Sequence, residues 1–255
     1  MLKVTFLGTG TSSGVPMIGC QCEVCTSSDS KNTRLRASVL LESDETKVVI
    51  DTGPDFRYQM LRSQVKELNA VVFTHEHKDH IAGLDDVRGF NYLMKSSMNI
   101  YATERVQKAL KREFYYAFET VKYPGVPQLE LNTIANQPFS VGDLVFEPIQ
   151  LMHYKMPVFG YRVGSFGYIT DANQISDEEL LKLIGVEVLV INALRETTHI
   201  SHFSLEEALE IIKRVAPKQA FLTHLSHQMP AHEQLEKKLP NNVSPAFDGM
   251  VVEIH

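Results

Sequence analysis

The sequence predicts an α/β fold, and three observations support this prediction. Short apolar runs rich in β-branched residues recur along the chain, as buried strands do. Stretches with apolar residues at helical spacing separate several of these runs. The 255-residue chain is 44% hydrophobic and 22% charged, a globular composition that excludes collagen-like, fibrous and largely disordered proteins.

Nine apolar runs are expected to form strands. Several are apolar throughout, which is typical of strands that are covered on both faces. In chain order, the predicted strands are 4–7, 37–41, 48–50, 70–73, 144–146, 167–170, 188–191, 220–222 and 251–254.

Helical patterns lie between some of these strands. The predicted helices are 55–68, 105–118, 177–184 and 205–215. The last has the clearest boundaries, because Ser204 and Glu207 form a capping-box pattern at its start and Pro217 ends it.

The proline-containing stretch 123–138 is the most loop-like part of the chain and the expected seam between two similar strand-rich halves. Composition does not shift across it, and strands resume on both sides. We therefore expect a single domain over residues 1–255, with helices covering the outside and a substantial buried core.

The sequence also carries expectations about location and partners. No apolar run approaches the roughly 18 residues of a membrane helix, and the first residues alternate like a strand rather than forming a signal peptide. We expect a cytoplasmic protein with no membrane contact. With 25 basic against 31 acidic residues and no Lys/Arg block, long nucleic acid is not an expected partner, because binding phosphates needs clustered cations.

A histidine-rich motif follows directly on the predicted strand 70–73. It reads His-Glu-His-Lys-Asp-His over residues 75–80. Residues two apart in an extended chain share a side, so His75 and His77 can bind one ion, while Asp79 and His80 on the following turn can bind a second. A catalytic ion uses about three protein ligands and keeps a position open for water, so two ions need more ligands than this motif offers.

The missing ligands are expected at other strand ends, because sites in α/β sheets gather at the carboxyl ends of strands. Four polar residues stand at such ends, namely Asp51, His153, Asp171 and His224. His153 would complete the first site, His224 would complete the second, and Asp171 can bridge both ions. Asp51 is expected to orient a metal-bound histidine rather than to bind metal itself.

The three cysteines form a second cluster, at Cys20, Cys22 and Cys25. An odd number of cysteines argues against a disulfide framework, as does a reducing compartment. Three soft ligands on one tight loop suit a structural zinc, although a tetrahedral shell needs a fourth ligand. Three buried cysteines or a redox centre are the alternative interpretations.

With these residues, the sequence resembles the metallo-β-lactamase superfamily over essentially the whole chain. Within it, the sequence is similar to the phosphoribosyl cyclic phosphate phosphodiesterases. Besides the metal motif and the cysteine cluster, the shared segments are Gly8-Thr9-Gly10-Thr11, Asp51-Thr52-Gly53, Gly83-Leu84-Asp85-Asp86 and Thr223-His224-Leu225-Ser226-His227-Gln228. The resemblance implies an αβ/βα four-layer sandwich of two mixed β-sheets with outer helices and a dinuclear site at one edge.

The resemblance also implies roles for two further histidines. It suggests His227 as the fourth ligand of the structural zinc, which would tie the N-terminal loop to the C-terminal strand. It favours His202 as the general acid that protonates the leaving group, with His199 as the alternative.

Arginines are the expected partners of a substrate phosphate, because the guanidinium group matches phosphate geometry. The candidates are Arg34, Arg36 and Arg88. The segment 8–14 resembles a phosphate loop, but it lacks the Gly-Lys-Ser/Thr ending, so we interpret it as a tight loop at the mouth of the site.

Together these features predict a dinuclear metal hydrolase acting on a small or cyclic phosphodiester. A hydroxide held by the ions would attack phosphorus, Asp171 would help to hold the charge, and His202 would donate the proton. The expected cofactors are two divalent ions, zinc or manganese, and one structural zinc. The expected partner is a small phosphorylated substrate, and a homodimer is one expected assembly. Thioester or lactone hydrolysis, ribonuclease Z-like RNA processing and a non-enzymatic zinc-stabilised interaction protein remain as alternatives.

Overall fold

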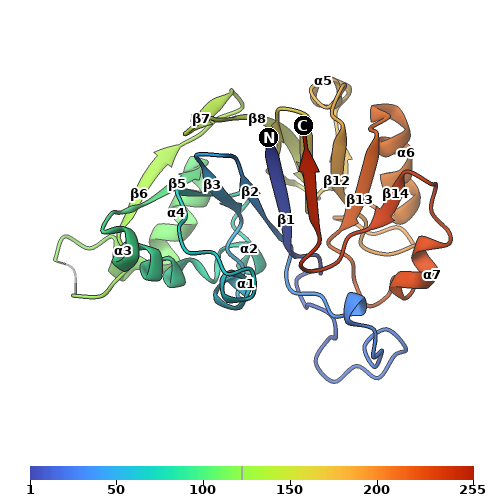
Figure 1. Cartoon of the computed structure of the whole chain (residues 1–255), viewed down its shortest axis with the longest axis horizontal. Helices are drawn as coiled ribbons and strands as arrows, with labels where there is room; N and C mark the ends of the chain where they lie inside the picture. The colour runs from blue at the N-terminus through green and yellow to red at the C-terminus, as the bar shows by residue number, and fades with distance from the viewer. Residues whose placement is uncertain (122) are drawn as a thin grey trace.

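Two mixed β-sheets pack face to face between outer helices in the computed structural model, which describes residues 1–121 and 123–255 (Figure 1). This is the four-layer α/β arrangement that the sequence predicts. The N- and C-terminal strands lie side by side in the first sheet, where Leu2 pairs with Ile254.

The first sheet has seven strands in the order β15-β1-β2-β3-β4-β5-β6. The strands from β3 to β6 are parallel, whereas β15, β1, β2 and β3 pair antiparallel. Their bounds are β1 Leu2–Gly8, β2 Ser38–Glu42, β3 Lys47–Ile50, β4 Ala70–Val72, β5 Met98–Ala102, β6 Leu129–Thr133 and β15 Val251–Ile254.

The second sheet has eight strands, in the order β11-β8-β9-β10-β12-β13-β14 with β7 paired to β8. Strands β10, β12, β13 and β14 pair parallel to one another, and the remaining pairs of the sheet are antiparallel. Their bounds are β7 Phe139–Val141, β8 Leu144–His153, β9 Met156–Val163, β10 Phe166–Ile169, β11 Gln174–Ile175, β12 Val188–Asn192, β13 Gln219–Thr223 and β14 Val243–Pro245.

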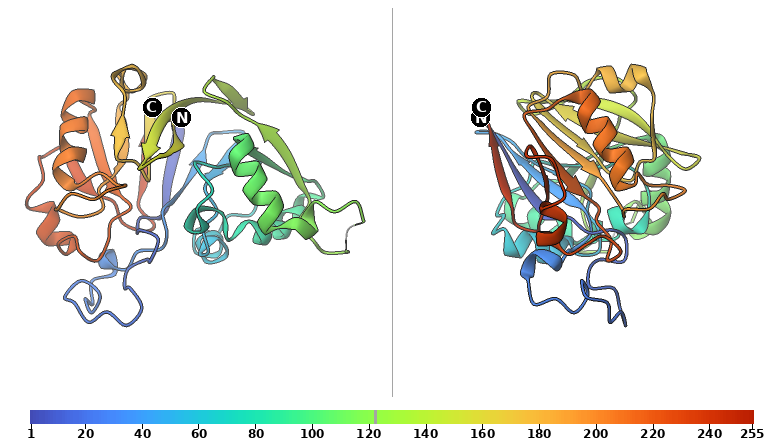
Figure 2. Two further views of the ribbon diagram at one scale, coloured as in Figure 1. Left: turned by 180° about the vertical axis from the view of Figure 1, so that it is seen from behind. Right: turned by 90° about the vertical axis from the view of Figure 1, so that its right-hand side faces the viewer.

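Helices cover the outer face of each sheet (Figures 1 and 2). The first sheet carries α1 Phe56–Arg62, α2 Lys78–Ile81, α3 Arg88–Met94, α4 Glu104–Glu113 and the 3-10 turns η2 Leu84–Val87 and η3 Tyr115–Ala117. The second carries α5 Asp177–Leu181, α6 Leu205–Val215 and α7 His232–Glu236, and η1 Ser30–Asn32 lies in the N-terminal loop. None of the helices in the described part of the chain is long and apolar enough to cross a membrane.

The core between the sheets is built from fully apolar faces of both. Phe6 of β1 contacts Phe221 of β13 edge to face, with ring centroids 5.6 Å apart. Phe146 and Tyr161, of β8 and β9, are also completely buried there. Burial of such large side chains from both sheets stabilises the face-to-face packing and fixes the position of one sheet relative to the other.

Sequence patterns located every one of the nine predicted strands, and α6 begins and ends as expected. The capping box at Ser204 and Glu207 is present with both hydrogen bonds. The seam expected at 123–138 is partly wrong, because it contains β6 at the edge of the first sheet. The chain does pass from the first sheet to the second just after it, through β7.

The segment between β1 and β2 forms a long irregular loop at one end of the sandwich, the blue loop of Figure 1. Isolated bridges tie its base to the rest of the molecule, with Gly10 pairing to both Arg36 and Leu225. The loop therefore meets the segment that follows β13, and this contact brings the cysteine cluster to the second sheet.

Candidate metal centre

The predicted metal residues leave the ends of strands from both sheets and meet at one edge of the sandwich. Asp51 follows β3, Asp171 follows β10 and His224 follows β13. All three have left-handed backbones, with φ of 65°, 53° and 55°. A non-glycine residue costs about 1–2 kcal/mol in that conformation, and such strain is concentrated at functional sites.

The first group of ligand atoms comes from His75, His77 and His153, whose candidate atoms all lie within 4.8 Å of one another. His75 and His77 follow β4, and His153 ends β8 on the other sheet. The rings of His77 and His153 lie 5.0 Å apart. The structure thus brings together the three residues predicted for the first ion.

The second group comprises Asp79, His80, Asp171 and His224, again with ligand atoms within 4.8 Å of one another. His80 Nε2 lies 2.9 Å from Asp171 Oδ2 and 3.2 Å from Asp79 Oδ2. His224 Nε2 lies 3.1 Å from the same Asp171 oxygen. The residues predicted for the second ion therefore converge as well.

Asp171 lies between the two groups. Its Oδ2 faces the second group, and the residue also falls within a cluster with His153 and His202, where its Oδ1 is 3.7 Å from His202 Nδ1. Asp171 thus reaches the second group through one oxygen and shares a cluster with His153 of the first group, and this intermediate position is what bridging of two ions requires.

Asp51 orients His80 through the ring nitrogen that does not face the second group. His80 Nδ1 donates to Asp51 Oδ2 at 2.7 Å, which leaves His80 Nε2 directed at the carboxylates of the second group. Thr74 anchors Asp51 by donating from its backbone N–H at 2.9 Å and from its hydroxyl at 2.7 Å. This carboxylate–histidine contact fixes tautomer and ring orientation, as metal-binding histidines require.

The first group is oriented in the same way. His153 Nδ1 donates to the Ser201 carbonyl at 2.7 Å, and His75 Nδ1 lies 3.0 Å from the Thr74 hydroxyl oxygen. Because that hydroxyl donates its own proton to Asp51, it accepts from His75. Both histidines thus carry the proton on Nδ1 and present Nε2 as a free ligand atom.

The donor set fits divalent metal ions. Within the described residues, the buried His75 Nε2 has no hydrogen-bond partner. Burial, and then the neighbouring His80, lowers the pKa of His75 well below its ordinary value, so its ring is neutral as a ligand must be. Buried imidazole nitrogens and carboxylate oxygens in this combination suit zinc, manganese or iron.

Charge in the second group is balanced inside the group itself. Although burial opposes both shifts, Asp171 and Asp79 raise the pKa of His80, and His224 and His80 hold the pKa of Asp171 well below its usual range. The same carboxylates, against burial, raise the pKa of His224 to about 9.

His202 lies beside both groups. Its ring is stacked on His224 at 4.8 Å and lies 4.7 Å from His153. His199 is further out, 5.2 Å from His202, and its Nδ1 accepts from the Ser201 backbone N–H at 3.3 Å. Burial and His224 lower the pKa of His202 to about 3, which favours the neutral ring.

A glycine allows the metal motif to sit close to β3. A Cβ on Gly53 would lie 2.1 Å from the backbone oxygen of Asp79, so only glycine allows this approach. The Asp-Thr-Gly segment therefore serves the site twice, through the Asp51 carboxylate and through the close backbone contact at Gly53.

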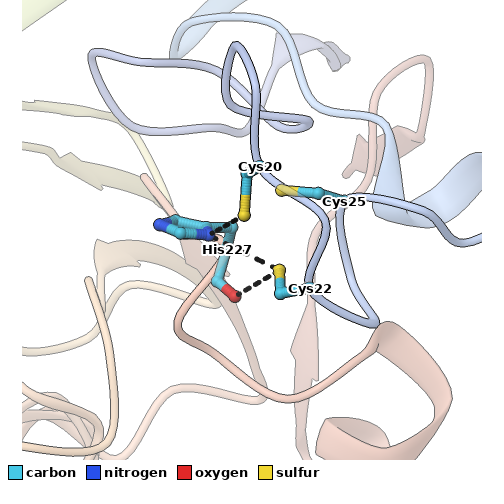
Figure 3. Close-up of side chains that lie close together, drawn as sticks. All are labelled: Cys20, Cys22, Cys25 and His227. Carbon is cyan, nitrogen blue, oxygen red and sulfur yellow. Dashed lines mark hydrogen bonds between the residues drawn. The ribbon is translucent and has the colours of Figure 1, made fainter.

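The three cysteines of the N-terminal loop lie around His227 (Figure 3). Ligand atoms of Cys20, Cys22, Cys25 and His227 lie within 4.8 Å of one another. His227 Nδ1 is 3.2 Å from Cys20 Sγ and 3.5 Å from Cys22 Sγ. The Cys25 backbone and His227 lower the pKa of Cys22 to about 6, which favours its thiolate, whereas burial raises the pKa of Cys25 to about 11. The set suits a tetrahedral zinc.

The expected role of Arg34 in binding substrate phosphate is wrong. Its side chain is 4% exposed, and it donates to the Thr9 hydroxyl and the Ala246 carbonyl and contacts His232 Nδ1. Arg34 therefore joins the N-terminal loop to the C-terminal part of the chain. Its guanidinium group is hydrogen-bonded to other parts of the protein and is buried, so it is not accessible to a substrate phosphate.

The other two arginines are also engaged with the protein. Arg36 pairs with Asp55 at 3.1 Å and donates to the Ser12 carbonyl. Arg88 pairs with Asp85 at 3.1 Å and lines a separate hollow with Lys95. The structure brings none of the three arginines into the two ligand groups.

Two asparagines that sequence analysis missed support the site. Asn192, at the end of β12, makes a pair of 3.0 Å hydrogen bonds with the backbone N–H and carbonyl of Ala172, next to Asp171. Asn173 accepts from the Tyr154 N–H and donates to the Ile200 carbonyl. The strand-end signal that identified Asp171 could have identified Asn192 too, whereas Asn173 carried no such signal.

Comparison with known proteins gives a consistent picture. A family model described as the beta-lactamase superfamily domain matches residues 46–225. The chain is 38% identical over 252 residues to an octanoyltransferase of Porphyromonas gingivalis. The aligned segment covers 98% of this chain and 51% of that protein. The chain is 28% identical over 169 residues to ribonuclease Z of Thermosynechococcus vestitus, covering 64% and 36%. The chain thus spans about half or less of these relatives.

Solved structures share the whole fold. One described as a new diphosphatase from the PhnP family is 37% identical with a TM-score of 0.94, covering 100% of this chain and 98% of that chain. The short form of human tRNase Z has a TM-score of 0.72 at 21% identity, covering 99% of each chain, which shows the fold alone.

Proposed function

The chain belongs to the metallo-β-lactamase superfamily, and from that premise we propose that it is a dinuclear metal-dependent phosphodiesterase acting on small or cyclic phosphodiesters. The observation that carries the proposal is the pair of adjacent ligand groups with Asp171 between them. Phosphoryl transfer is the chemistry that a two-ion clamp suits well, since charge develops on both the attacking and the leaving oxygen.

Two ions, when bound, would supply an activated water and neutralise charge on the phosphoryl oxygens. His75, His77 and His153 would hold one ion, and Asp79, His80 and His224 the other. Asp171 would bridge the two. We propose zinc or manganese for these positions and a structural zinc for the cysteine cluster.

His202 is the residue we assign to proton donation. Among the two candidates it lies nearer the ligand groups, and its ring touches both His153 and His224. A bound phosphodiester would bring negative charge next to this buried ring, raise its pKa and allow it to carry the proton that the leaving oxygen takes. His199, exposed further and hydrogen-bonded to Ser201, is better placed to orient this loop.

Hydrolysis of a thioester or other acyl group is the second candidate, and the octanoyltransferase relative is the observation that favours it. That relative is about twice as long as the matched segment, so its activity need not reside in the part that this chain resembles. The same ion pair can polarise a carbonyl oxygen.

Parallel assays separate these candidates. We expect the protein reconstituted with zinc or manganese to hydrolyse phosphodiesters such as bis(p-nitrophenyl) phosphate, and to act poorly on phosphomonoesters, thioesters and lactones. Turnover of only thioesters or lactones would overturn the phosphodiesterase proposal. His202→Ala should lose most on diesters with poor leaving groups, because a good leaving group needs no proton.

A further inference from the structure

A cleft of about 480 Å³ opens beside the first ligand group. Two of its wall residues, His77 and His153, are themselves candidate metal ligands. The side chains that complete the wall include Arg105, Tyr154, Lys155, Met156 and Ile200. We call this space the hairpin cleft. A substrate whose phosphoryl group is bound at the ligand groups can extend directly into it.

One side of the hairpin cleft is the tip of the β8–β9 hairpin. His153 pairs with Met156, so Tyr154 and Lys155 form a two-residue turn. Tyr154 has a φ of 57°, in the left-handed region where such turns favour Gly, Asn or Asp. The residue is 47% exposed, so core packing does not explain an aromatic side chain there. Strain of this kind points to a functional demand.

The hairpin tip is held in place against the loop that carries His202. Asn173 Oδ1 accepts from the Tyr154 N–H at 2.7 Å, and its Nδ2 donates to the Ile200 carbonyl at 3.0 Å. Two apolar wall residues are thus fixed to the same side chain. A binding surface that is already ordered loses little conformational entropy when a ligand binds.

The hairpin cleft also carries positive charge. Lys155 Nζ lies over one face of the Tyr154 ring, 5.2 Å from its centre, and it takes part in none of the ion pairs within residues 1–121 and 123–255. Arg105 bonds to Glu76 through Nε, at 2.5 Å. An aromatic face, aliphatic neighbours and an unpaired ammonium group together suit a flat ring attached to an anionic group.

We propose that the hairpin cleft binds an aromatic, nucleobase-sized organic group of the phosphodiester, stacked on Tyr154, with Lys155 supplying positive charge beside it. This inference rests on the proposed phosphodiesterase function and names the substrate class: diesters in which the alcohol that stays on phosphorus, not the one that leaves, carries a flat ring. Stacking tolerates different rings, so the cleft selects for aromatic character rather than for one base.

A matched pair of diesters tests the proposal. Thymidine 5′-(p-nitrophenyl phosphate) and methyl p-nitrophenyl phosphate release the same p-nitrophenolate and differ in the other group. We expect the metal-loaded protein to have a higher kcat/KM for the thymidine ester. Tyr154→Asn suits the left-handed turn and removes the large ring, so it should lower the ratio of the two kcat/KM values about tenfold while preserving the melting temperature.

The controls separate stacking from a general loss of activity. Tyr154→Phe should keep the ratio, because the ring remains, and Lys155→Gln should raise KM for the thymidine ester. Tyr92→Ala removes another exposed tyrosine, one that lines a different hollow, and should change the turnover of neither ester. Thymidine 5′-monophosphate should also bind more weakly to the Tyr154→Asn protein in calorimetric titration.

The outcomes distinguish two kinds of failure. Turnover of both esters with equal kcat/KM, or an unchanged ratio in Tyr154→Asn, would overturn the aromatic subsite and leave the phosphodiesterase proposal standing. Absence of turnover of both esters with zinc and with manganese would overturn the phosphodiesterase proposal and the subsite that rests on it.

Discussion

The two candidate metal regions of this protein are built in opposite ways. Ligands of the His/Asp centre leave strands of both sheets, and Asp51, Thr74, Ser201 and Asn192 hold them or their neighbours by hydrogen bonds. Three of the four residues of the cysteine cluster lie on one long irregular loop and are only half-buried. The fold itself therefore positions the first region, whereas we expect the second to depend on a bound metal for its order.

Substitution of Asp171 should cause the largest loss of activity and so the largest contrast with a substitution in the cysteine region. Asp171→Asn keeps the volume but removes the charge between the two ligand groups, so we expect kcat on a phosphodiester to fall on the order of 10³-fold or more. Steady-state kinetics with metal analysis would measure this. Cys20→Ser is the matched variant in the other region, and it should retain diester turnover within a few-fold. Equal losses in the two variants would contradict the separation of roles.

Asp51 tests the hydrogen bond that orients a ligand histidine of the His/Asp centre. Asp51→Asn leaves His80 without its carboxylate acceptor, and we expect metal affinity or activity to fall about 10–100-fold. Competition with a chromophoric chelator measures the affinity. Asp143→Asn, at an exposed position bonded to Ser43, is a control for loss of one carboxylate and should have no effect. Unchanged affinity in Asp51→Asn would mean that packing alone orients His80.

Metal removal from the cysteine region should loosen the N-terminal loop without unfolding the sheets. Cys22→Ser should increase hydrogen exchange and proteolytic cleavage between residues 11 and 33, because the loop then loses its link to His227. Amides of β4 and β12 should exchange as in the parent protein. Faster exchange throughout both sheets would show that the cysteine site stabilises the whole fold.

The smallest expected effect is a pH dependence of protein stability that arises from His232, at the base of the N-terminal loop. Burial and Arg34 lower the pKa of His232 to about 4, so the folded protein keeps this ring neutral while the unfolded chain protonates it near its ordinary value. This part of the stability is present above about pH 6.5 and is lost as pH falls toward 4. Denaturant unfolding of parent and His232→Asn proteins across pH 4–7.5 measures it. An identical slope in both would exclude His232 as a contributor.

Much of this arrangement could be predicted from sequence, because its signals are local. The Asp-Thr-Gly and His-x-His-x-Asp-His segments follow apolar strands directly, and strand ends are where α/β sheets gather their sites. Strand ends likewise pointed to His153, Asp171 and His224, which the structure brings beside the motif.

The errors concern contacts that depend on tertiary structure. Arg34 has the chemistry of a phosphate ligand, but its burial against Thr9 and His232 is set by residues far along the chain. The contribution of Asn173 and the aromatic hairpin tip at Tyr154 depends on which loops meet across the site. Side-chain type alone does not determine such tertiary contacts, so sequence patterns could not reveal them.

Metal content measured together with activity tests the central claim most directly. We expect about three ions per chain in the parent protein and about two in Cys20→Ser, with phosphodiester turnover preserved in the variant. One ion per chain in the parent protein and none in Cys20→Ser would contradict the account, because the His/Asp centre would then hold no metal.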